Sequence, residues 1–129
     1  MKKMICITVA LLLAFILLGC AGVSANNNYG KDDRDIIAHA GKTFTITLEE
    51  NPSTGYAWTV DISDKTVVSL ENEEYRQEPG SEDIAGAGGL KVLTFKGLKK
   101  GTAAITLVYE RGFEEGSATD TLIYNITVK

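Results

Sequence analysis

Residues 43–58, TFTITLEENPSTGYAW, predict two β-strands joined by a short, stiff loop. Within 43–48 apolar and polar residues alternate strictly, which is the period of a strand with one buried face. In the loop, 51–55, proline fixes one φ angle and glycine permits a positive one, so the turn is tight and preorganised. Tyr56 and Trp58 then return the chain at period two to a second strand. Taken alone, these residues also fit an ordinary hairpin turn.

The same alternation recurs after residue 35, and no stretch beyond Cys20 has a helical period of useful length. Strands are expected at 36–38, 43–48, 56–62, 67–70 with an extension to 75, 90–95, 102–109 and 119–128. In 90–95 we expect Leu90 and Val92 to be buried, with Leu93 and Phe95 as further candidates. About seven short strands at this spacing predict an all-β fold, an immunoglobulin-like antiparallel β-sandwich. Trp58 is the expected core aromatic between the sheets.

Residues 1–19 are interpreted as a lipoprotein signal peptide. Two lysines precede an apolar run that is too short and wrongly flanked for a membrane-spanning helix. The run closes on LLGC, which resembles the lipobox of prokaryotic lipoproteins, so Cys20 is the expected site of lipid attachment. The alternative is a plain signal peptide that is cut a few residues later, for instance after Ala25. In either case we expect an exported protein.

The polar residues 20–34 are interpreted as a lipid-anchored flexible tether, and 35–129 as the folded domain. No cysteine follows Cys20, so the domain must be stabilised by its apolar core. Without the two N-terminal lysines, 11 basic residues face 17 acidic ones, a net charge near -6. This charge argues against nucleic acid and against electrostatic adhesion to anionic lipid. We therefore expect the protein to meet the cell membrane or outer membrane, at the periplasm or cell surface, only through lipid on Cys20. We also expect a monomer.

Catalytic chemistry is poorly represented. With one histidine, His39, and no free thiol in the domain, a Cys/His site is impossible and a Ser/His/Asp triad is unfavourable. The same scarcity disfavours zinc, and His39 is expected at the surface. The carboxylates fall in polar runs, and Glu82 with Asp83 lacks the spacing of a recognised calcium loop. We expect no enzyme activity, no cofactor and no metal.

Three segments stand out from this background: the first loop (51–55), the second loop (86–89) and the third loop (109–113). In a sandwich of this kind, alternate connections emerge at the same end. The three loops can therefore share one edge, as binding loops on such scaffolds do.

The residues of these loops resemble those of the chagasin-like inhibitors of papain-family cysteine peptidases. NPSTG at 51–55 matches that family's NP[ST]TG loop, and GAGG at 86–89 matches its GxGG loop. The family's third loop is R-P-[WF] and follows a tyrosine. Tyr109 matches that tyrosine, and Arg111 and Phe113 match the first and last residues of the loop. Gly112 stands where proline is typical. The resemblance implies a reversible inhibitor whose three loops occlude the cleft of a papain-like peptidase.

The implied peptidase-binding residues are Asn51, Pro52, Ser53, Thr54, Gly55, Gly86, Ala87, Gly88, Gly89, Arg111, Gly112 and Phe113. Ser53 and Thr54 would lie beside the catalytic Cys/His pair, with the second loop against one wall and the third against the other. Because of Gly112, we expect weaker inhibition than from a protein with R-P-W. The rival hypothesis is a surface-exposed immunoglobulin-like adhesion or assembly module without a peptidase target.

Overall fold

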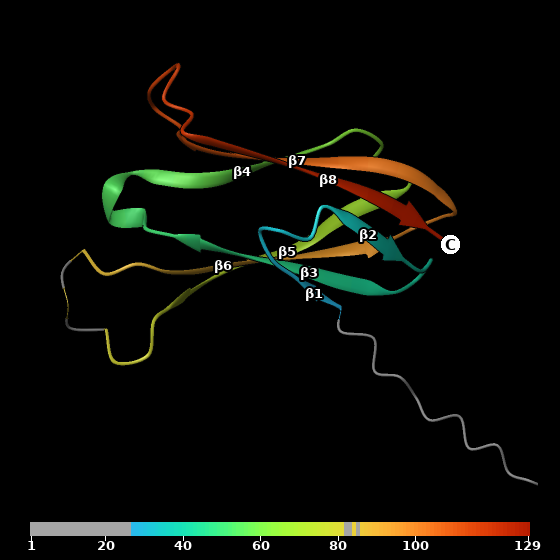
Figure 1. Ribbon diagram of the computed structural model, residues 1–129, viewed down its shortest axis with the longest axis horizontal. Coiled ribbons are helices and arrows are strands. Elements are labelled where there is room, and N and C mark those ends of the chain that lie inside the picture. The colour runs from blue at the N-terminus through green and yellow to red at the C-terminus, as the bar shows by residue number, and fades with distance from the viewer. Residues whose placement is uncertain (1–26, 82–83, 85) are drawn as a thin grey trace, which may run out of the picture.

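The computed structural model describes residues 27–81, 84 and 86–129. The predicted signal peptide, the lipid on Cys20 and the acidic pair Glu82 and Asp83 lie outside these residues. In the described part of the chain, strands form two four-stranded sheets that pack face to face (Figure 1). No helix there is long or apolar enough to cross a membrane.

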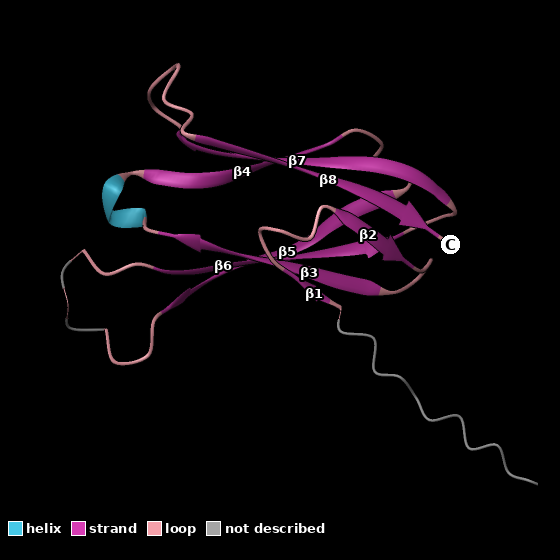
Figure 2. Cartoon of the chain, in the orientation of Figure 1, coloured by secondary structure: helices cyan, strands magenta, loops and turns pink. Residues whose placement is uncertain are grey.

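The strands follow the sequence pattern closely. Their bounds are β1 (Asn28–Tyr29), β2 (Asp35–Ala38), β3 (Thr43–Glu50), β4 (Tyr56–Ile62), β5 (Val68–Gln77), β6 (Gly89–Gly97), β7 (Gly101–Arg111) and β8 (Asp120–Val128). A single 3-10 turn, η2 (Pro52–Thr54), lies between β3 and β4 and is the cyan element of Figure 2. One sheet has the order β1-β3-β6-β5 and the other β2-β8-β7-β4.

The predicted immunoglobulin-like sandwich is confirmed, but its sheets are mixed rather than wholly antiparallel. β1 runs parallel to β3, and β2 runs parallel to β8. All other neighbours are antiparallel. Both parallel pairs join strands that are not consecutive in the chain, so no tight hairpin imposes the antiparallel direction.

The core consists of the inward-facing residues of both sheets. The fully buried side chains with the largest volumes are Tyr124, Phe95, Ile36, Ile46, Leu93, Ile105, Leu107, Leu122, Ile126 and Val68. Trp58 is buried between the sheets as expected, with 7% of its surface exposed. Burial of these side chains supplies most of the folding free energy, at about 1.5–3 kcal/mol for each large apolar side chain.

In β6 the preferred buried face was predicted wrongly. Leu93 and Phe95 are completely buried, whereas Leu90 and Val92 are half-buried. The register decides this, because Leu93 is paired with Ile46 of β3, which faces the core. Paired residues of neighbouring strands lie on the same face of a sheet.

The folded unit also begins before residue 35. β1 lies within the segment that was expected to be a tether, and it pairs with Thr45 and Ile46. The hydroxyl of buried Tyr124 donates a hydrogen bond of 3.0 Å to the carbonyl oxygen of Gly30. Lys31 forms an ion pair of 3.0 Å with Asp120. Residues 27–34 are therefore attached to the sandwich, by polar contacts and by the packing of Tyr29 against Phe44, which the apolar pattern of the sequence did not indicate.

Candidate functional site

The three loops lie at one end of the sandwich. Figure 1 shows η2, the described residues of the β5–β6 connection and the β7–β8 connection at its left, away from the C-terminus. His39, which precedes β3, is exposed and lies near Gly97, at the opposite end of that strand. Within the described residues, no three His, Cys, Asp or Glu side chains are grouped as a metal site.

Asn51 organises the first loop through its side chain. Its Oδ1 accepts hydrogen bonds from the backbone N–H of Ser53 at 3.2 Å and from the Ser53 hydroxyl at 2.6 Å. This is an N-cap, which satisfies backbone donors at the start of a helical turn. Pro52 occupies the first position of the turn, and Gly55 ends it with a φ of 83°, in the left-handed region. The loop is thus held in one conformation by its own residues.

The two hydroxyls at the tip of the loop are both used inside the loop. Thr54 Oγ1 donates to the carbonyl oxygen of Asn51 at 2.7 Å, and Ser53 donates to the Asn51 side chain. A hydroxyl has one proton to donate and two lone pairs to accept with. Ser53 and Thr54 can consequently accept hydrogen bonds from a partner but have no proton left for it. Both residues are exposed, and so is Pro52.

The first and second loops are connected by the same asparagine. Asn51 Nδ2 donates to the carbonyl oxygen of Gly86 at 3.0 Å. Gly86 has a φ of 80°, which side chains rarely tolerate, and a Cβ on Gly88 would lie 3.4 Å from the carbonyl oxygen of Glu50. A Cβ on Gly89 would lie 2.2 Å from the carbonyl oxygen of Arg76. Positive φ at Gly86 and close packing at Gly89 therefore explain two glycines of GAGG, whereas a Cβ on Gly88 would make only an ordinary contact.

The first and third loops are connected by Arg111 and Phe113. Arg111 Nε donates to the carbonyl oxygen of Thr54 at 3.2 Å, and its guanidinium lies 4.6 Å from the centre of the Tyr56 ring. The Phe113 ring lies against Gly55, where a Cβ would approach it to 3.2 Å. Phe113 is nevertheless 81% exposed, an unusually large free surface for an aromatic side chain.

The third loop is also braced from within. The Arg111 backbone N–H donates to Ser117 Oγ at 2.9 Å, and that hydroxyl donates back to the Arg111 carbonyl oxygen at 3.0 Å. Arg111 also pairs with Glu114 at 3.1 Å. β7 continues to Arg111, so only Gly112 and Phe113 of the predicted loop lie beyond the strand.

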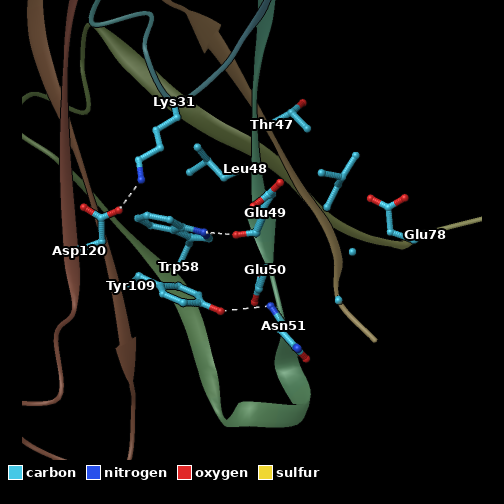
Figure 3. A pocket seen from close by; sticks show the side chains of 13 residues that line it. Lys31, Thr47, Leu48, Glu49, Glu50, Asn51, Trp58, Glu78, Tyr109 and Asp120 are labelled. Carbon is cyan, nitrogen blue, oxygen red and sulfur yellow. Dashed lines mark hydrogen bonds and ion pairs between the residues drawn. The ribbon is translucent and has the colours of Figure 1, made fainter. Parts of the chain in front are cut away.

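Two aromatic side chains of the β2-β8-β7-β4 sheet hold the end of β3 and the start of the first loop. β1 covers β3 only as far as Ile46, so the last residues of β3 have a free edge. Trp58 Nε1 donates to the carbonyl oxygen of Glu49 at 2.8 Å, and the Asn51 N–H donates to the Tyr109 hydroxyl at 3.1 Å (Figure 3). The sequence interpretation gave Trp58 a core role and left Tyr109 out of the site. The only hint in the sequence of this supporting role is that aromatic residues recur beside the loops.

All three predicted loops therefore meet, and Asn51, Thr54 and Arg111 carry the contacts between them. Comparison with known sequences assigns the family: the model of chagasin family peptidase inhibitor I42 matches residues 37–128. The chain belongs to the chagasin family. The resemblance stated from the loop motifs is thereby confirmed. The roles of the individual loop residues in binding a peptidase remain a prediction.

Curated relatives of this chagasin-family chain come from Entamoeba histolytica. Amoebiasin-2 is 38% identical over 66 residues, which are 51% of this chain and 53% of that protein. The chain thus spans about half the length of this relative. Amoebiasin-1 is 35% identical over 71 residues, which are 55% of this chain and 67% of the relative.

Solved structures support the same fold. The crystal structure of the cysteine protease inhibitor EhICP2 from Entamoeba histolytica superposes with a TM-score of 0.68 at 28% identity, covering 79% of this chain and 94% of that one. The structure of PbICP-C in complex with falcipain-2 has a TM-score of 0.61 at 22% identity, covering 81% of this chain and 91% of that one. At this lower identity the second likeness concerns the fold alone.

Proposed function

We propose that this chagasin-family protein is a reversible inhibitor of papain-like cysteine peptidases that occludes the active-site cleft with its three loops. The observation that carries the proposal is the set of contacts joining the loops into one edge, Asn51 to Gly86 and Arg111 to Thr54. Family membership supports the same function, and so does the naming of EhICP2 as a cysteine protease inhibitor.

In the proposed mechanism the first loop enters the cleft. Its exposed tip, Pro52–Thr54, is narrow and held by internal hydrogen bonds, so little conformational entropy is lost on binding. The lone pairs of Ser53 and Thr54 accept hydrogen bonds from donors beside the catalytic pair. These small side chains fill the space beside the catalytic pair while no backbone carbonyl of the loop is correctly placed for attack. The loop therefore occupies the site without being cleaved.

The other two loops contact the walls of the cleft. The second loop lets backbone groups approach one wall closely because Gly86 and Gly88 carry no side chains. Phe113 offers an exposed ring to the other wall, where aromatic contacts add about 0.5–1.5 kcal/mol beyond burial. We expect an interface of standard size, about 1,600 Å² in total.

The test is an assay of papain with a fluorogenic peptide in the presence of purified residues 26–129. The proposal predicts stoichiometric, reversible inhibition that is overcome by dilution. Absence of inhibition at micromolar protein would contradict it and would favour the adhesion or assembly module instead. Gradual loss of inhibition during incubation, with a cut inside 51–55, would show a substrate rather than an inhibitor.

Gly112→Pro is expected to strengthen inhibition. Gly112 lies outside the positive-φ glycines, and a Cβ there meets nothing within 4 Å, so a larger residue has room. At a compatible position proline reduces the conformational freedom of the unbound loop, an effect of about 0.4–1 kcal/mol in free energy. This corresponds to a two- to fivefold lower inhibition constant. The inhibition constants of wild type, Gly112→Pro and Gly112→Ala for papain measure this. A proline variant no better than the alanine variant would contradict the expectation.

We further propose that the domain is exported and anchored through lipid on Cys20, as a monomer. The basic start, the apolar run and the LLGC sequence support this. Incorporation of labelled fatty acid into the wild type but not into Cys20→Ser would test it, with membrane fractionation as the second readout. Equal labelling of both proteins would exclude Cys20 as the attachment site.

A further inference from the structure

A cavity of about 700 Å³ lies beside the free edge of β3, behind the first loop. Figure 3 shows its lining, which comes from both sheets: the end of β3, Trp58 of β4, Tyr109 of β7, and the pair Lys31 and Asp120. Its volume falls in the range of about 300–1,000 Å³ that small-ligand sites occupy. Asn51, Gly88 and Gly89 line its edge and also belong to the predicted peptidase-binding residues, but the interior of the cavity has no role in the inhibitory contacts proposed above.

Glu50 is the unexplained residue of the cavity. It continues the inward alternation of Phe44, Ile46 and Leu48 along β3, so its side chain takes a core position and is only 6% exposed. Within the described residues no hydrogen bond or ion pair reaches its Oε2. A buried carboxylate oxygen without a partner is costly, by about 1–3 kcal/mol or more for a charged group. Such an atom calls for a ligand.

The surroundings of Glu50 indicate what that ligand must be. Four acidic residues line the cavity, Glu49, Glu50, Glu78 and Asp120, against a single lysine. That lysine, Lys31, is already paired with Asp120. The remaining excess of negative charge favours a cation.

The aromatic side chains add a second preference. Trp58 and Tyr109 are in contact, 4.9 Å apart between ring centres and tilted by 32°, and both line the cavity. The faces of such rings attract ammonium and guanidinium groups and also pack against methylene groups. Leu48 and Leu90 contribute further apolar surface. The cavity is thus suited to a charged head on an apolar stem.

We propose that this cavity binds a single alkyl-ammonium or alkyl-guanidinium group, the chemistry of a lysine or arginine side chain or of a small free amine. The cationic head pairs with the buried carboxylate of Glu50, and the stem lies along Trp58 and Tyr109. The exposed carboxylates of Glu49 and Glu78 attract the cation to the mouth. Binding is non-covalent.

The ionisation of Glu50 makes the binding depend on pH. Burial raises the pKa of this carboxyl; Lys91 of β6 opposes the rise and Glu73 of β5 adds to it. The other charged or titratable groups that line the cavity are Lys31, Glu49, Glu78, Tyr109 and Asp120. A cation stabilises the ionised form, so its affinity falls as the pH drops through the raised pKa of Glu50 in the unliganded protein. The loss of affinity therefore begins at a higher pH than it would with an unburied glutamate.

Trp58 provides a direct readout because it is the single tryptophan of the chain. Its indole N–H gives one resonance in the NMR spectrum of the isotopically labelled protein. Titration with n-butylguanidinium is expected to shift this resonance saturably at neutral pH, whereas neutral n-butanol leaves it almost unchanged. Equal responses to the two probes would show a merely apolar cavity and would overturn the proposal.

Glu50→Gln is the decisive variant, since it keeps the shape of the side chain and removes its charge. It is expected to weaken n-butylguanidinium binding about ten- to hundredfold, the value of a charge-assisted hydrogen bond. Glu71→Gln, which makes the same charge change at an exposed position of β5 outside the cavity, is expected to bind as the wild type does. Equal weakening in both variants, or none in Glu50→Gln, would overturn the assignment.

Two further arms complete the test. If Glu50→Gln does not fold, the double change Glu49→Gln and Glu78→Gln at the mouth is expected to weaken binding several-fold, and unchanged binding would contradict the proposal. A capped Gly-Arg-Gly peptide distinguishes the sources of the cation. Binding of the peptide as tightly as n-butylguanidinium indicates a protein side chain as the natural occupant. Binding of the small probe alone indicates a free amine or guanidine.

Discussion

Thr54→Trp is expected to raise the inhibition constant for papain at least about tenfold, equivalent to 1.4 kcal/mol or more. Thr54 is exposed at the tip of the first loop, where a narrow profile is what allows entry into a cleft. The indole adds bulk at this point and also removes the hydroxyl that donates to Asn51. Both changes act on binding and leave the sandwich core untouched. Unchanged inhibition by a folded Thr54→Trp protein would refute insertion of this loop.

Thr127→Trp is the matched control for this prediction. Thr127 is an exposed threonine of β8, next to the C-terminus and at the end of the sandwich opposite the loops (Figure 1). The same substitution there is expected to change the inhibition constant by less than about twofold, since surface changes away from a site usually cost within ±0.5 kcal/mol. A comparable loss in both variants would indicate a general effect on folding.

Gly89→Ala is expected to lower the free energy of unfolding by about 1–3 kcal/mol, the usual cost of overpacking. The added Cβ would lie 2.2 Å from the carbonyl oxygen of Arg76 and 2.7 Å from the hydroxyl of Tyr75. The first of these atoms is backbone, so β5 has to move away from β6. Because Gly89 begins β6 directly after the second loop, inhibition should weaken together with stability.

Urea unfolding monitored by circular dichroism measures the effect as a lower midpoint with an unchanged slope. Gly112→Ala is the matched control, because a Cβ at that position meets no atom within 4 Å. We expect its midpoint to be no lower than that of the wild type. A midpoint for Gly89→Ala within error of this control would show that β5 accommodates the methyl group without cost.

Much of this fold was predictable because its signals are local. Strict alternation in 43–48 and the return at Tyr56 and Trp58 placed two strands and the loop between them correctly. The expected meeting of the three loops also followed from sequence, since alternate connections of a sandwich emerge at one end. Pro52 and Gly55 indicated a stiff turn from their backbone preferences alone, and the structure has a 3-10 turn there.

Register and edge contacts were less accessible. The LKVLTF segment, 90–95, has apolar residues on both faces, so alternation could not select Leu93 and Phe95, and pairing with β3 did so. β1 is two residues long and polar in part, which leaves no periodic signal. Glu50 is buried at an inward position, which its charge gave no reason to predict, because its burial depends on the opposite sheet.

The sequence by itself determined the class of fold, the three loops and the family to which they point, because each depends on the backbone preferences of a few adjacent residues. Only the tertiary structure decided how the loops are joined and what supports them. The first loop is bonded to the second loop through Asn51, to the third loop through Arg111 and to β7 through Tyr109. The two residues joined by each of these hydrogen bonds are 35 to 58 positions apart in the chain. Hydrogen bonds over such separations form only once both sheets have packed.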